Sequence, residues 1–175
     1  MFDCPPRDLL GWLASMRNGT RVLFVVTSAA LLAGACGSKP PLTKAQYEQK
    51  VNQIGKQLST TLDTTFSSPK LQHAGSLKEA AEVFRVAQKN LEDAANRLDS
   101  LRPPEQVTNT HDLLVKGFRD FAHAFGRFAR ATENGDLSAI QKFNQQVSDQ
   151  TLPAMIEIQR AIDQLKAKGF DISRG

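Results

Sequence analysis

The amino-acid sequence predicts an all-α fold, an antiparallel four-helix bundle in which successive helices run up, down, up and down. Three observations predict it. Apolar residues recur every three or four positions in four long segments that follow Thr43. Turn-forming residues such as Pro69, Pro104 and Gly135 separate these segments by short intervals, and short loops favour antiparallel neighbours. No stretch shows the alternating apolar pattern of a strand.

Capping boxes mark the starts of the first two predicted helices. The first box is Thr43 to Gln46, and Ser67 to Pro69 is expected to end that helix. Its apolar stripe consists of Tyr47, Val51, Ile54, Leu58 and Leu62. The second box is Ser76 to Glu79. The helix that follows carries a heptad seam of Leu77, Phe84, Leu91 and Leu98 interleaved with Ala80, Ala87, Ala94 and Leu101. The alanines in this seam predict close approach of a neighbouring helix.

The third predicted helix runs from about Glu105 to Glu133, and Asn134 and Gly135 are expected to end it. Its stripe consists of His111, Leu114, Phe118, Phe121, Phe125 and Phe128. Asp136 is expected to cap the fourth helix, in which Pro153 should introduce a kink or a split. The stripe of this helix consists of Ile140, Phe143, Val147, Thr151, Met155, Ile158, Ile162 and Leu165. Gly169 should end it, and Phe170 and Ile172 are expected to fold back over the end of the bundle.

The N-terminal part of the chain has the organisation of an export signal. Val22 to Ala35 is a run of 14 residues without a charge, preceded by Arg17 and Arg21. A membrane-spanning helix needs roughly 20 residues, whereas a signal-peptide apolar region is about this short. Residues 1–15 are unusual for such a signal because they add two acids and two prolines. We therefore expect translation to start at Met16.

The apolar run ends in Ala33-Gly34-Ala35-Cys36, which resembles the lipobox of bacterial lipoproteins, although Ala33 stands where that family prefers Leu. The resemblance implies diacylglycerol on the Cys36 sulfur, cleavage between Ala35 and Cys36, and anchoring to the extracytoplasmic side of the cell membrane. The alternative is an ordinary secretory signal that happens to precede a cysteine. The predicted domains are a signal peptide at 1–35, a lipidated cysteine and proline-containing tether at 36–42, and a helical domain at 43–175. Cys4 would leave with the signal peptide, so no disulfide is expected.

Composition excludes a nucleic-acid partner and points away from catalysis. The first 35 residues hold three basic and two acidic residues, which leaves 19 basic and 16 acidic residues and a net charge of +3. That charge is too small for nucleic-acid binding. The histidines, His73, His111 and His123, have no metal-ligand spacing, and no nucleophile motif occurs. We therefore predict no enzyme activity, no metal and no cofactor, and interpret His111 as a hydrogen-bonded histidine at the edge of the core.

Two groups on the third helix are candidate contact sites. Phe121 and Phe125, together with Met155 of the fourth helix, are a candidate pocket for a small apolar ligand, and a packed core is the alternative. Gly117 and Gly126 flank the phenylalanines, either for close helix packing or to leave space for a ligand. The second candidate site is a basic face for contact with an anionic surface, and a solvated face is the alternative. It consists of Lys116, Arg119, Arg127 and Arg130.

The helical region also resembles small helical lipoproteins of high-GC bacteria that have no assigned activity. The likeness rests on Leu101-Arg102-Pro103-Pro104, Val107, His111-Asp112-Leu113-Leu114, Gly117 and Gly169-Phe170. It implies the helical fold and no function. The sequence therefore predicts a membrane-anchored, non-enzymatic binding or scaffold domain whose partner is an unknown envelope protein. A carrier or sensor of a small apolar ligand, held between the third and fourth helices, is the alternative.

Overall fold

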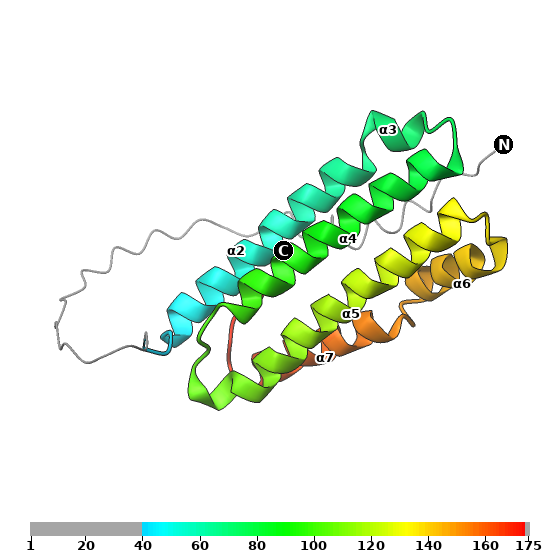
Figure 1. Ribbon diagram of the computed structural model, residues 1–175. Helices are drawn as coiled ribbons and strands as arrows, with labels where there is room; N and C mark the ends of the chain where they lie inside the picture. The colour runs from blue at the N-terminus through cyan, green and yellow to red at the C-terminus, as the bar shows by residue number, and fades with distance from the viewer. Residues whose placement is uncertain (1–39, 174–175) are drawn as a thin grey trace.

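The computed structural model describes residues 40–173 (Figure 1), and this part of the chain is helical without any strand. The proposed signal peptide and the lipidation site therefore lie outside the described residues. The helical elements are α2 (Lys44–Phe66), α3 (Pro69–Gln72), α4 (Leu77–Asp99), a 3-10 helix η1 (Glu105–Val107), α5 (Thr108–Glu133), α6 (Leu137–Ser148) and α7 (Pro153–Ala167).

The long helices lie side by side in a bundle-like arrangement, as Figure 1 shows. Helix α4 packs against α2 on one side and against α5 on the other. Helix α5 in turn packs against both α6 and α7, which follow one another along its length. The all-helical class predicted from the sequence is confirmed. Helix α5 is the central element, because it contacts the helices before and after it in the chain.

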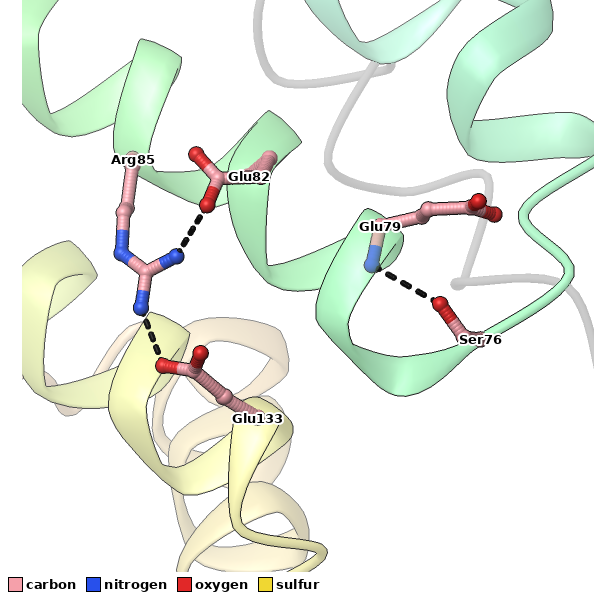
Figure 2. Close-up of polar contacts among 5 residues, drawn as sticks. All are labelled: Ser76, Glu79, Glu82, Arg85 and Glu133. Atoms are coloured by element: carbon pink, nitrogen blue, oxygen red, sulfur yellow. Dashed lines mark hydrogen bonds and ion pairs between the residues drawn. The ribbon is translucent and has the colours of Figure 1, made fainter.

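Side-chain caps fix the starts of three helices, as predicted. In the Thr43 box the Thr43 amide donates to Gln46 Oε1 at 3.0 Å, and the Gln46 amide donates to Thr43 Oγ1 at 3.3 Å. Asp136 Oδ1 accepts from the Ala139 amide at 3.0 Å. At the start of α4, the Glu79 amide donates to Ser76 Oγ at 3.2 Å (Figure 2). The Glu79 carboxylate accepts from Gly75 rather than from Ser76, so only half of this box has the expected pairing.

The fourth predicted helix is split in two. Helix α6 ends at Ser148 and α7 begins at Pro153 as its first residue, where the missing N–H costs no helical hydrogen bond. Between them Gln150 takes a positive φ of 55°, which interrupts the helical path. Thr151 lies in this break and is exposed, so its predicted place in the apolar stripe is wrong. The rest of the stripe continues because α7 restarts with Ile158 and Leu165 buried.

Three further local predictions need correction. Pro69 begins the short helix α3 instead of only ending α2, because a proline suits the first helical position. Leu77, the first member of the α4 seam, is 38% exposed, because it lies at the first residue of the helix. Residues from Glu105 begin the third helix as a 3-10 turn before α5 proper starts at Thr108. The ends at Asn134, Gly135 and Gly169 are as predicted, with both glycines at positive φ.

Small residues bring the helices of the core close together. Ala87 on α4 and Ala122 on α5 are fully buried in one apolar cluster. Gly117 of α5 faces Ile158 of α7, and a Cβ atom at Gly117 would lie 2.8 Å from Ile158 Cγ1 and 3.2 Å from its backbone nitrogen. Close helix packing, one of the two explanations open for Gly117, is therefore the one that the structure supports.

Ion pairs fasten the outer edges of the same helix pairs. Arg85 of α4 contacts Glu82 on its own helix and Glu133 near the end of α5 (Figure 2). These side chains are about one third or more exposed, so the ion pairs contribute little stability on their own. The ion pair between Arg85 and Glu133 joins α4 to the end of α5, but it contributes little to the stability of their packing.

We expect Gly117→Ala to destabilise the domain by about 1–3 kcal/mol, because the added methyl group pushes α7 away from α5. Gly126→Ala is the matched control on the same helix. There the nearest atom is Gln88 Oε1, at 2.6 Å, which belongs to a flexible side chain that can rotate away. Any contact that Gln88 loses in Gly126→Ala is offset, because Ala favours the helix over Gly by up to about 1 kcal/mol. Denaturant unfolding followed by circular dichroism measures both. Equal effects at the two positions would contradict close packing at Gly117.

Candidate functional site

The predicted lipidation site, Cys36, and the cleavage residue Ala35 lie outside the described residues, and both stay predictions. The structure does describe where the tether joins the domain. The Leu42 amide donates to the Arg102 carbonyl at 2.9 Å, and the Leu42 side chain packs against the main apolar cluster. The chain therefore enters at the end of the bundle where α4 leads into α5. An anchor on Cys36 lies within roughly 20 Å of that end, given the reach of an extended chain.

The phenylalanines of the candidate apolar pocket form a packed aromatic cluster. Phe125 is 5% exposed, and its ring centroid lies 5.2 Å from that of Phe121 and 5.5 Å from that of Phe143 on α6. Phe128 stacks on Phe143 at 4.3 Å. Phe66 from α2 and Phe84 from α4 complete the cluster, so rings from four helices fill the space. Met155 and Phe121 pack together with a third apolar group that includes Leu152.

Two open grooves lie on the surface of the described region, and neither is lined by Phe121 or Phe125. One, of about 530 Å³, follows the outer side of α7 and includes Met155, Ile156 and Arg160. The other, of about 590 Å³, lies between α2 and α4 and has Ile54 and Leu58 on its floor. Of the three proposed pocket residues, Met155 alone therefore reaches one of these grooves. The geometry favours a filled aromatic core over a ligand cavity at Phe121 and Phe125.

The basic face of α5 is divided by ion pairs. Lys116 Nζ lies 2.6 Å from Asp120 Oδ2 on the same helix and 2.9 Å from Glu157 Oε2 on α7, and these hydrogen bonds raise the pKa of Lys116. Arg119 lies 2.9 Å from Asp99 of α4. Lys116 and Arg119 thus join α5 to its neighbours at the surface. Contact with an anionic surface stays a prediction, and within residues 40–173 Arg127 and Arg130 are the members of this face outside the ion pairs.

The structure buries a polar pair that spacing alone did not reveal. Tyr47 is fully buried on α2, and its hydroxyl lies 3.0 Å from Nδ1 of His111 on α5, which is 3% exposed. Within the described residues, His111 Nε2 has no hydrogen-bond partner. Burial raises the pKa of Tyr47, and the nearby Asp112 carboxylate raises it further. Burial lowers the pKa of His111, against opposing effects of Asp112, Asp99 and the Leu98 carbonyl.

Both members of this pair are therefore uncharged at neutral pH. With Nδ1 as the acceptor, the Tyr47 hydroxyl donates and the imidazole proton sits on Nε2. The Phe170 ring covers Tyr47 edge-on at 5.7 Å. Neither surface groove is lined by Tyr47 or His111, so neither of the two opens onto the pair. The interpretation of His111 as a hydrogen-bonded core histidine fits this geometry, whereas its partner Tyr47 was assigned only an apolar role.

Glu48 and Asn52 were also missed, although both lie on the predicted first helix. Glu48 Oε1 accepts from the Asp171 amide at 2.8 Å. Asn52 donates to the Asp171 carbonyl at 2.9 Å and accepts from the Ser173 amide at 3.0 Å. Their spacing of four residues places them one turn apart on the same side of a helix. That spacing was readable from the sequence, but the chain segment that they bind was not.

Within residues 40–173, no three His, Cys, Asp or Glu side chains gather where they would hold a metal ion together. None of the helices described is both long and apolar enough to cross a lipid bilayer.

Comparisons with known proteins give no relative. No protein family model, no curated protein and no solved structure matches the chain.

We expect Phe125→Ala to cost about 3–5 kcal/mol, because it empties a buried site surrounded by other rings. A domain of this size is stable by about 5–15 kcal/mol, so the loss is a large share of the total. Arg130→Ala, an exposed change on the same helix, is the control and should leave the free energy of unfolding unchanged. Guanidinium unfolding measures both. A small effect of Phe125→Ala would mean that the aromatic cluster is loosely packed.

The lowered pKa of His111 makes stability depend on pH. The folded protein binds this proton less readily than the unfolded chain, whose histidine has a pKa near 6.5. Stability from His111 is therefore full above pH 6.5 and is lost as pH falls below it toward the lowered folded value. We expect His111→Gln, which keeps a hydrogen-bonding partner for Tyr47, to reduce this loss. His123→Gln, an exposed change on the same helix, should lose stability with falling pH as the wild type does. Urea unfolding of the three proteins between pH 7.5 and pH 5 measures the difference.

Proposed function

We propose that this protein is a lipid-anchored helical module that binds or scaffolds another component of the cell envelope and catalyses no reaction. In this proposal Cys36 carries the lipid on the extracytoplasmic side of the cell membrane. The helical domain then stands close to the membrane surface on its short tether. We further propose that the helices form an antiparallel, up-down-up-down bundle, with α6 and α7 together as the fourth arm.

The filled aromatic core is the observation that supports a binding module over a carrier. A carrier needs an internal cavity of about 300–1,000 Å³ lined by apolar side chains. Phe121 and Phe125, the residues proposed for that cavity, instead contact each other at 5.2 Å, and Phe125 contacts Phe143 at 5.5 Å. A solid core leaves the surface as the part of the domain that makes contacts.

The position of His111 supports the absence of catalysis. A general acid or base must come within hydrogen-bond reach of a substrate atom. His111 is 3% exposed and bonds to Tyr47, whose ring packs in turn against Phe170. The other histidines, His73 and His123, are exposed. The histidine chemistry of the described region therefore serves packing.

The lipid anchor is tested by metabolic labelling with a fatty acid in cells that express the full chain. We expect the wild type to incorporate label and to fractionate with membranes. Cys36→Ser should incorporate no label and remain as an unlipidated precursor with shifted gel mobility, because the sulfur that accepts diacylglycerol is gone. Cys4→Ser is the matched control and should behave as the wild type. Incorporation that persists in Cys36→Ser, or that never occurs in the wild type, would contradict the anchor.

A second measurement separates the binding module from the carrier. Native mass spectrometry of the purified full chain, with Cys36→Ser to remove the anchoring lipid, should give the mass of the protein alone. A co-purified apolar molecule that Phe125→Ala releases would contradict the binding module and support the carrier.

A further inference from the structure

The C-terminal residues 170–173 lie along α2, and the Ile172 amide donates back to the Phe170 carbonyl at 3.2 Å, which forms a tight turn at Asp171. Gly169 turns the chain out of α7 with a φ of +80°, and Figure 1 shows the red tail turning back toward α2. Phe170 and Ile172 are 2% and 3% exposed, whereas Asp171 and Ser173 are exposed. Alternate side chains therefore point into the domain and out to solvent.

Helix α2 binds the backbone of this segment. Glu48 accepts from the Asp171 amide, and Asn52 makes one hydrogen bond to the Asp171 carbonyl and another to the Ser173 amide. All three bonds involve main-chain atoms of the tail, so they hold any peptide that follows this path whatever its side chains. Recognition of peptide segments commonly combines such main-chain bonds with pockets for alternate side chains.

The pockets for alternate side chains are also present. Phe170 packs edge-on against Tyr47 at 5.7 Å, and the ammonium of Lys44 lies 5.6 Å from the Phe170 ring centroid. An aromatic ring is favoured here over an aliphatic side chain, because a nearby cation is attracted to its face. Ile172 enters the main apolar cluster beside it. The segment occupies a groove that accepts an aromatic side chain at the first position and an aliphatic side chain two positions later, with the side chain between them exposed.

We propose that this groove is the recognition site for a partner segment of that pattern, and that the tail is its resident occupant, which the partner displaces. The inference rests on the proposed binding function for the existence of a partner, and on the seated tail for the partner's chemistry. Displacement replaces the contacts of the tail with the same contacts from the partner. A modest excess in the local concentration of the partner segment over that of the tail therefore decides which of the two occupies the groove. Anchoring of both components to one membrane supplies such an excess.

The tail is also suited to leave without unfolding the bundle. It hangs on the single hinge at Gly169, and its polar bonds lie at the exposed surface of α2. Helix α2 keeps its extensive contact with α4 when the tail is gone. Local opening of a short segment needs less free energy than global unfolding.

Binding of a labelled peptide to the full chain tests the proposal. The probe is a fluorescent peptide with the sequence of residues 168–173, Lys-Gly-Phe-Asp-Ile-Ser. The full chain with Phe170→Ala and Ile172→Ala has a weakened tail, and we expect it to bind the probe saturably. The wild type should bind at least 10-fold more weakly, because its own tail competes. A probe with Ala at both apolar positions should not bind.

Two variants in the weakened-tail background check the groove itself. Asn52→Ala removes two main-chain contacts and should weaken probe binding several-fold. Asn96→Ala, an exposed amide on α4, is the control and should leave it unchanged. Equal binding by the wild type and the weakened-tail variant, or no binding by a variant that is fully helical, would overturn the proposal. Dimers that form by exchange of tails would assign the occupant to a second copy and overturn the partner assignment.

Hydrogen exchange of the wild-type chain decides the matter if the weakened-tail variant does not fold. We expect the amides of Asp171 and Ser173 to exchange at least 100-fold faster than the core amides of α5, through local opening. Exchange of the tail together with α5 would make the tail an integral part of the core and overturn the proposal. Because neither assay involves lipid, its failure leaves the anchor on Cys36 standing, and failure of fatty-acid labelling leaves the groove standing.

Discussion

The close approach of α5 to the helices beside it is the constraint on which the rest of the structure depends. Gly117 admits Ile158 of α7 at a distance where no larger residue fits, and Ala87 and Ala122 are fully buried between α4 and α5. Backbones this close exclude water and leave no room between these helices. Bulky side chains of the core pack beside these close contacts, toward α2 and toward α6.

This division explains why the features of interest gather around α2. The aromatic cluster, the Tyr47–His111 pair and the C-terminal tail all lie between α2 and the α5–α7 part of the molecule. Rings are large enough to fill that space near Phe66, and the tail fills it at the other end near Tyr47. The hydrogen bond between Tyr47 and His111 also crosses this seam.

Surface charge has a secondary role in the fold. Lys116, Arg119 and Arg85 each join α5 to a neighbouring helix through exposed carboxylates, and such pairs contribute little stability where solvent screens them. They do change which cations are free to meet a partner. Of the four cations on the α5 face, Lys116 and Arg119 are held in ion pairs, and Arg127 and Arg130 make none with the residues that the structure describes. Recognition by the apolar groove along α2 does not depend on that face.

The sequence by itself determined the helical class, most helix ends and the break at Pro153. These follow from local chemistry: caps at Thr43 and Asp136, glycines at positive φ, and a proline that cannot donate a hydrogen bond. Only the tertiary structure decided that Tyr47 bonds to His111, that Lys116 and Arg119 are paired, and that Glu48 and Asn52 bind the tail. Each of these contacts joins residues far apart in the chain. Periodicity places a side chain on a face of its own helix, but the packing of whole helices decides which face it meets.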